Sequence, residues 1–156
     1  MKQRIVLFLV LLVMTGAVGT AMAFTPDENA YLDYQSRVLE LVNEERASAN
    51  LPLLRMAKPE AIRVAMYRAY EISIRFTHTR PNGSGVQTLL YDYGVRFRRY
   101  GENLAYGYDS AASVMNGWMR SQSHKANIMQ KEFTMLAVGV YRTNGTRYWV
   151  QIFLAD

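Results

Sequence analysis

Three ionisable residues in this chain have the types and surroundings that could support chemistry. His78 lies in FTHTRPNGSG, Glu102 in YGENLAYG and His124 in SQSHKANIM, and the two histidines are the only ones in the chain. Each lies in a glycine- or serine-bounded segment just outside a predicted regular element, where side chains can converge on a cleft. Two imidazoles and a carboxylate could hold a divalent metal such as zinc, with one position open for water. They could also act as general acid and base.

The spacing of these residues does not select one reaction. The sequence has neither the HExxH pattern of helical zinc sites nor a GxSxG turn. A hydroxyl from Ser84, Ser121 or Ser123 could be activated by a histidine. The chain contains no cysteine, which excludes thiol catalysis and thiolate metal ligands. A purely structural role also stays open, because histidines in loops often hold a turn and a glutamate can bond backbone amides.

Helices are predicted around the first of these segments. Apolar residues recur at helical spacing over residues 31–45, after a capping box at residues 25–28 and before a stop at residues 50–52. A second helix is predicted over residues 59–74, and its expected buried stripe consists of Ile62, Met66, Ala69 and Tyr70. His78 follows as the chain leaves this helix.

Glu102 is predicted on a strand and His124 in a turn. A short helix over residues 86–93 ends at Gly94, and residues 100–107 are expected to be extended. The next helix begins after Asp109 or Ser110 and ends near Ser121, so SQSH is interpreted as the turn that follows it. Two β-rich runs, 135–141 and 147–153, flank Asn144-Gly145, which predicts a type I′ hairpin. This order of elements indicates the α+β class.

The start of the chain has the layout of a secretory signal peptide. Lys2 and Arg4 precede an apolar run over residues 5–14, and Ala21-Met22-Ala23 is a small-x-small cleavage site before Phe24. We therefore expect a signal peptide over residues 1–23, no transmembrane segment in the mature chain, and a single domain over residues 24–156 in the periplasm or outside the cell. The formal charge falls from +5 to +3 when the two basic residues are removed. No long basic run supports nucleic-acid binding.

The motifs together resemble the CAP superfamily, which comprises the cysteine-rich secretory proteins, antigen 5 and pathogenesis-related proteins, also called SCP-like extracellular proteins. The resemblance rests on LVNEERASANLPLL, FTHTRPNGSG, YGENLAYG, a helix with Trp118, SQSHKANIM, VGVY and YWVQIF, in that order. It spans nearly all of the chain after the signal peptide. It implies a three-layer α-β-α sandwich with a central, mainly antiparallel sheet.

The resemblance also implies that His78, Glu102 and His124 meet in a central cavity, where some relatives bind zinc. Many eukaryotic members have a second cavity glutamate three residues after the helix tryptophan, and this chain has Ser121 there. The loss of that carboxylate should weaken a metal site held by His78, His124 and Glu102.

The function expected first is a secreted, monomeric binding module for a lipid, peptide, glycan or envelope protein, without enzymatic activity. One alternative is a hydrolase, such as a protease, that uses His78, His124 and Glu102. The other alternative is a polar cluster that only stabilises the fold. Zn²⁺ is the cofactor expected if the cavity binds a metal.

Overall fold

The computed structural model describes residues 28–156, with side chains in the first helix from residue 33 onward. The predicted signal peptide and residues 25–27 of the predicted capping box lie outside the described residues. The elements in chain order are α1 (Glu28–Ser48), β1 (Arg55–Met56), α2 (Pro59–Ile74), α3 (Val86–Asp92), β2 (Arg99–Tyr106), α4 (Ala111–Arg120), α5 (Gln122–Ile128), β3 (Met135–Thr143) and β4 (Thr146–Ala155).

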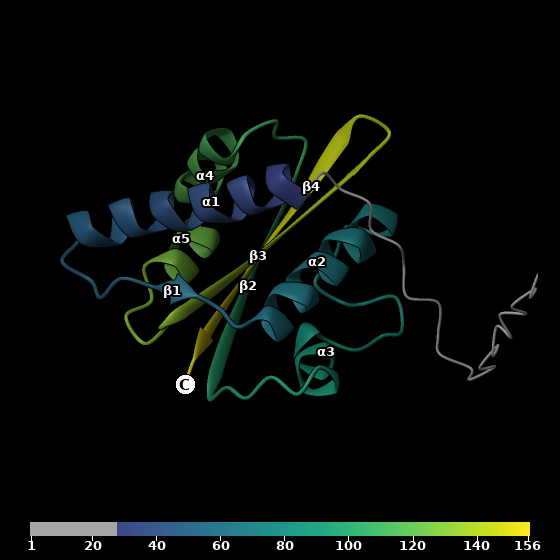
Figure 1. Ribbon diagram of the computed structural model, residues 1–156, viewed down its shortest axis with the longest axis horizontal. Coiled ribbons are helices and arrows are strands. Elements are labelled where there is room, and N and C mark those ends of the chain that lie inside the picture. Colours follow the sequence, from purple (N-terminus) through teal and green to yellow (C-terminus); the bar gives the residue numbers. More distant parts are fainter. Residues whose placement is uncertain (1–27) are drawn as a thin grey trace, which may run out of the picture.

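The described chain forms three layers. The sheet has the order β1-β3-β4-β2, with β1 parallel to β3 and the other neighbours antiparallel. The strands run between α1, α4 and α5 on one face and α2 and α3 on the other (Figure 1). The predicted α-β-α sandwich with a mainly antiparallel sheet is therefore confirmed, and β2 lies at one edge of the sheet.

Successive side chains on the hairpin strands pack alternately into the two cores. Leu136, Val138 and Val140 of β3 pack in the core under α1 and α4, whereas Met135 and Ala137 pack in the core under α2. This alternation follows from the two-residue period of a strand. It explains why residues 135–140 and 149–155 are apolar except for Gln151, since both faces of the sheet are covered there.

The hairpin turn has the geometry that the sequence predicts. Thr143 pairs with Thr146, so only two residues connect the strands. Asn144 and Gly145 have φ values of 48° and 77°, as a type I′ turn requires at both positions. The prediction from Asn144-Gly145 is confirmed.

The first helix ends as predicted and carries a buried charge. Asn50 adopts a left-handed φ of 55°, and the Leu51 N–H returns to the Arg46 carbonyl at 2.9 Å. The guanidinium of Arg46 is fully buried and donates to the carbonyls of Pro52, Ile128, Gln130 and Phe133. Arg46 thus ties the end of α1 to the end of α5.

The predicted buried stripe of α2 is wrong except at Ala69. The residues of α2 that the structure buries are Ala61, Val64, Ala65, Arg68, Ala69, Glu71 and Ile72. Ile62, Met66 and Tyr70 are only half-buried, because α2 turns its small residues toward the sheet. A Cβ on Gly139 of β3 would lie 2.0 Å from the Ala65 carbonyl oxygen, so helix and strand are in backbone contact.

The segment SQSH also forms a different structure from the predicted turn. The preceding helix does begin after the Ser110 cap and ends at Arg120. However, Ser121 then starts α5 immediately, so His124 lies on a short helix and not in a turn. The physical reason is that Gln122–Ile128 gains a buried anchor, Ile128, which packs in the core with Trp118.

We expect Gly139→Ala to destabilise the fold by about 1–3 kcal/mol, because the new methyl group must push α2 away from β3. The free energy of unfolding from urea titration measures this loss. Arg142→Ala, at an exposed position of the same strand, is the matched control and should leave the unfolding midpoint in place. Equal midpoints for wild type and Gly139→Ala would contradict the close helix–strand contact.

Candidate functional site

The centre of the site is a buried ion pair between α2 and the edge strand. Arg68 Nε donates to Glu102 Oε1 at 2.8 Å, and Arg68 Nη1 donates to Glu71 Oε2 at 2.7 Å. The side chains of Arg68 and Glu102 are only 1% and 5% exposed. Burial alone would lower the pKa of Arg68, but the two carboxylates outweigh it and hold that pKa above its ordinary value.

A second arginine completes the network. Arg80 Nε donates to both oxygens of Glu71, at 3.0 and 3.2 Å, and Arg80 Nη2 lies 2.9 Å from Oε1. The Nη2 group of Arg68 donates to the Thr77 carbonyl at 3.0 Å. Arg68 and Arg80 therefore hold both ends of the segment 77–80, which carries His78. We call Arg68, Glu71, Arg80 and Glu102 the buried charge network.

His78 lies on this network and faces solvent. Its Nδ1 is 2.7 Å from Glu102 Oε2, while its side chain is 64% exposed. Since a carboxylate can only accept, Nδ1 carries the hydrogen and the ring nitrogen Nε2 keeps its lone pair in the neutral imidazole. The buried charge network therefore orients an accessible nitrogen.

His124 approaches from the opposite helical layer. Its backbone carbonyl on α5 accepts from Asn103 Nδ2 of β2 at 3.0 Å. Asn127, also on α5, donates to Asn103 Oδ1 at 2.8 Å and to the Glu102 carbonyl at 3.3 Å. Burial, and then repulsion from His78, lower the pKa of the His124 imidazole below 6.5. The contacts of Asn103 and Asn127 hold α5, which carries His124, against β2.

The structure joins two of the three predicted site residues directly, since His78 bonds Glu102, whereas His124 reaches β2 through its backbone carbonyl. Glu102 of β2 is bonded by Arg68 of α2, and α5, which carries His124, bonds the same strand, so both helical layers contact the edge strand. Among residues 28–156, no group of three His, Cys, Asp or Glu side chains lies close enough together to hold a metal ion.

The three candidate serines make other contacts. Ser84 Oγ bonds Asn82 Oδ1 and Thr88 Oγ1, each at 2.7 Å. Ser121 and Ser123 bond each other at 3.2 Å. These hydroxyls are thus engaged with neighbouring polar groups in their own segments.

Sequence reasoning missed Arg68, Glu71 and Arg80, which hold the site in place. A signal for Arg68 exists in the sequence. Residues 61, 64, 65, 68 and 72 follow the i, i+3, i+4, i+7, i+11 spacing of one helical face, and all but Arg68 are apolar. A charge on an otherwise apolar face indicates a buried ion pair, because an unpaired buried charge is strongly destabilising.

Comparison with known proteins gives the family. The model of the cysteine-rich secretory protein family, CAP, matches residues 39–153. The chain belongs to the CAP family. Among curated proteins, the uncharacterized protein YkwD of Bacillus subtilis is 28% identical over 123 residues, which cover 78% of this chain and 47% of YkwD. This chain thus spans about half the length of YkwD.

Solved structures of CAP proteins share the fold. An extracellular protein with an SCP domain from Bacillus anthracis superposes with a TM-score of 0.74 at 27% identity, covering 80% of this chain and 41% of that one. An outer surface protein of Borrelia burgdorferi superposes with a TM-score of 0.60 at 24% identity, covering 83% of this chain and 94% of that one. The resemblance seen in the sequence motifs is confirmed.

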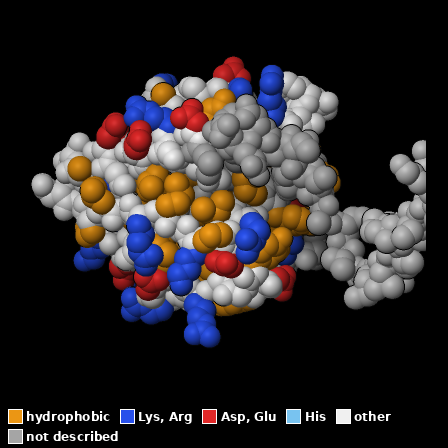
Figure 2. Space-filling model, viewed as in Figure 1, with side chains coloured by type: hydrophobic (Ala, Val, Ile, Leu, Met, Phe, Trp, Pro, Cys, Tyr) orange, Lys and Arg blue, Asp and Glu red, His pale blue; other side chains and the backbone are white. Residues whose placement is uncertain are grey.

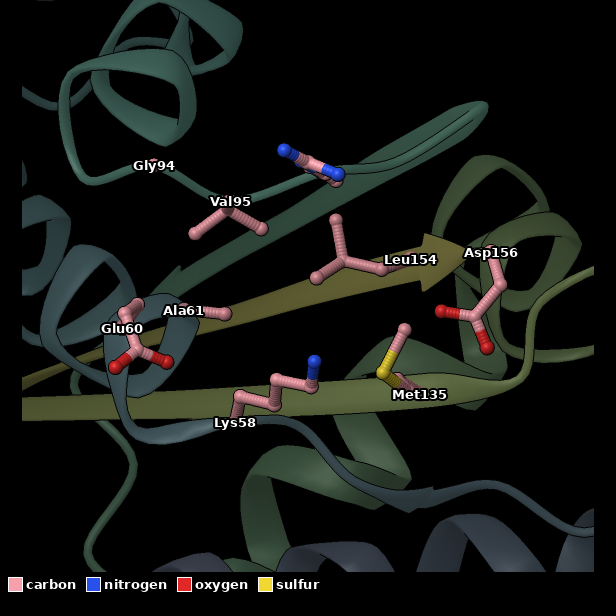
Figure 3. A pocket seen from close by; sticks show the side chains of 9 residues that line it. Lys58, Glu60, Ala61, Gly94, Val95, Met135, Leu154 and Asp156 are labelled. Atoms are coloured by element: carbon pink, nitrogen blue, oxygen red, sulfur yellow. The ribbon is translucent and has the colours of Figure 1, made fainter.

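A separate cavity of about 420 Å³ lies between the start of α2 and the segment after α3. In Figure 3, Val95, Leu154 and Met135 surround it, and Lys58 and Asp156 face the same space. None of the three predicted site residues lines this cavity.

The space-filling view shows basic and acidic side chains intermixed with apolar ones on the face drawn (Figure 2). Within residues 28–156, every helix is too short or too polar to cross a membrane.

Removal of the Arg68 side chain should strongly destabilise the fold. We expect Arg68→Ala to lower the free energy of unfolding by about 3–5 kcal/mol, because Glu71 and Glu102 would remain buried without their shared partner. Arg63→Ala on the same helix is the control. Arg63 is 58% exposed and pairs with Glu60 at 3.5 Å, so its loss should cost less than about 1 kcal/mol. Similar losses in the two variants would contradict the structural role of the network.

His124 should make stability depend on pH. Its native pKa lies below the ordinary 6.5, so the unfolded state binds more protons as the pH falls below 6.5. The His124 contribution is therefore complete above that pH and is lost below it. Urea unfolding at pH 7.5 and 5.5 should show a smaller decrease for His124→Asn than for wild type. An equal decrease in both proteins would contradict the lowered pKa.

Proposed function

We propose that this chain is an extracytoplasmic CAP binding domain whose contact site is the pair His78 and His124 at the β2 edge. The proposal rests on the difference in exposure between the two partners of one hydrogen bond. Glu102 is buried and fixed by Arg68, whereas the imidazole that it orients is mostly exposed. An accessible side chain held by a buried network is preorganised for binding, because little conformational freedom is lost when a ligand arrives.

The ligand that we propose for this site is a divalent metal held by the two imidazoles. His78 would bind through Nε2, since Glu102 occupies Nδ1, and His124 would bind in its neutral form, which its lowered pKa favours. Both oxygens of Glu102 already accept hydrogen bonds, one from Arg68 and one from His78. Glu102 would therefore orient the His78 ring while His78 binds the metal. A bound zinc ion would supply a Lewis-acidic position for an oxygen or nitrogen ligand.

A hydrolase has less support than a binding domain. The three candidate serines bond other polar side chains, as described above, and not the histidines. The buried charge network supports a structural role for Arg68, Glu71 and Arg80, whereas the exposure of His78 supports a role beyond stability. Location outside the cytoplasm is supported by the signal-peptide pattern of residues 1–23 and by the extracellular SCP-domain relative.

Calorimetric titration of zinc into the exported, metal-free protein tests the proposal. We expect binding in the micromolar range at pH 7.5, and loss of binding in both His78→Ala and His124→Ala with the fold retained by circular dichroism. Binding should weaken below about pH 6, because protonated imidazole cannot bind a metal.

Ser123→Ala, beside His124 on α5, is the matched control and should bind zinc as wild type does. Absence of zinc binding by the wild-type protein, or retention of full affinity in either histidine variant, would contradict the proposed metal site.

A further inference from the structure

The exposed aromatic side chains of the described residues lie near the two ends of β2. At the first end, Tyr91 stacks on Phe97 with ring centroids 5.1 Å apart, and Phe97 meets the edge of Tyr100 at 5.5 Å. Tyr91 and Tyr100 are exposed. We call these three residues the Tyr100 cluster.

The second end of β2 has a similar group. Phe76 contacts Tyr106 with ring centroids 4.7 Å apart, and Tyr106 stacks on Tyr148 at 6.0 Å. Phe76 and Tyr106 are exposed. We call these three residues the Tyr106 cluster. Exposed aromatic groups of this kind usually mark a binding surface, since their burial against a partner is favourable.

The two clusters lie on the α2 side of the strand, and between them the exposed His78 lies over Glu102 and Leu104, whose side chains are buried. Tyr100, Glu102 and Tyr106 are separated by even numbers of residues, so their side chains leave β2 on the same face. Six residues of strand separate the two tyrosines by about 20 Å. Glu102 lies near the middle and holds the exposed His78. The resulting row is an aromatic cluster, an imidazole and a second aromatic cluster.

The backbone edge of β2 is closed to an added peptide strand. The Gly107 N–H donates to the Arg147 carbonyl, so Gly107 belongs to a hydrogen-bonded pair with β4. Such pairs occur at every second residue of an antiparallel strand. The backbone N–H and C=O groups of Glu102 and Leu104 therefore point away from β4. Their outward carbonyls already accept from Asn127 Nδ2 and Trp118 Nε1, each at 3.3 Å. A partner along this row must therefore bind through side chains and ring faces.

We propose that the row binds a linear glycan chain. Pyranose rings offer C–H faces that pack on tyrosine and phenylalanine rings, and hydroxyl groups that can bond tyrosine hydroxyls and imidazole. A linear chain of pyranoses can lie on both clusters and cross His78 between them. This inference names the ligand class of the proposed binding domain and rests on that function.

The test measures binding of cellohexaose and chitohexaose to the exported protein by calorimetry. At least one hexasaccharide should bind about tenfold more tightly than its own disaccharide, which is too short to reach both clusters. Tyr100→Ala and Tyr106→Ala should each weaken hexasaccharide binding by about tenfold, because each removes a stacking surface. Leu53→Ala, at an exposed apolar residue outside the row, is the matched control and should bind as wild type does.

The inference is overturned by the absence of binding to both hexasaccharides, by equal affinity for the disaccharide and hexasaccharide, or by unchanged affinity in both tyrosine variants. Binding of decaproline at the same tyrosines, in place of either sugar, would assign the row to a peptide instead. Zinc titration of Tyr100→Ala and Tyr106→Ala should match wild type. Failure of glycan binding is thereby distinguished from failure of the zinc site.

Discussion

The rest of the site depends on one physical constraint, the neutralisation of the guanidinium of Arg68 beneath α2. A buried cation needs buried anions, and Arg68 has two, one on its own helix and one on the edge strand. The pair with Glu102 therefore fixes α2 against β2. The same carboxylate has one oxygen left, and that oxygen holds His78. A charge that stabilises the fold thus also positions an accessible side chain.

The edge strand β2 is contacted by side chains from both helical layers. Strands β3 and β4 are covered on both faces, so their side chains are used in packing. Strand β2 has a neighbour only on one side, and its outward carbonyls are bonded by side chains of α4 and α5. These contacts protect the edge from strand addition. They also bring α5, with His124, to the same edge as His78.

Much of the fold is predictable from local sequence signals. Asn144-Gly145 fixes a turn whose backbone few other residues adopt, and Ser110 supplies a capping box for α4. The segments around His78, Glu102 and His124 were found because histidine is rare in this chain and the motifs resemble one family. The expectation that His78 and His124 meet came from the resemblance alone, because no local pattern specifies which loops converge.

The parts that were missed depend on distant partners. Arg68 can be buried only because Glu102 lies 34 positions further along the chain, and no propensity encodes that pairing. The predicted stripe of α2 failed because size and hydrophobicity favoured Ile62 and Met66, whereas contact with Gly139 requires small residues. SQSH was interpreted as a turn because it is polar, but Ile128 and the Arg46 contacts stabilise it as the start of a helix.

The most direct test of the central claim is the tautomer of His78, measured by ¹H–¹⁵N correlation spectra of the imidazole at pH 9. If Glu102 orients the ring, Nδ1 carries the hydrogen and Nε2 has the shift of an unprotonated nitrogen, and Glu102→Gln loses that preference. A wild-type ring with its hydrogen on Nε2, or the same mixture of tautomers in both proteins, would contradict the orienting role of Glu102.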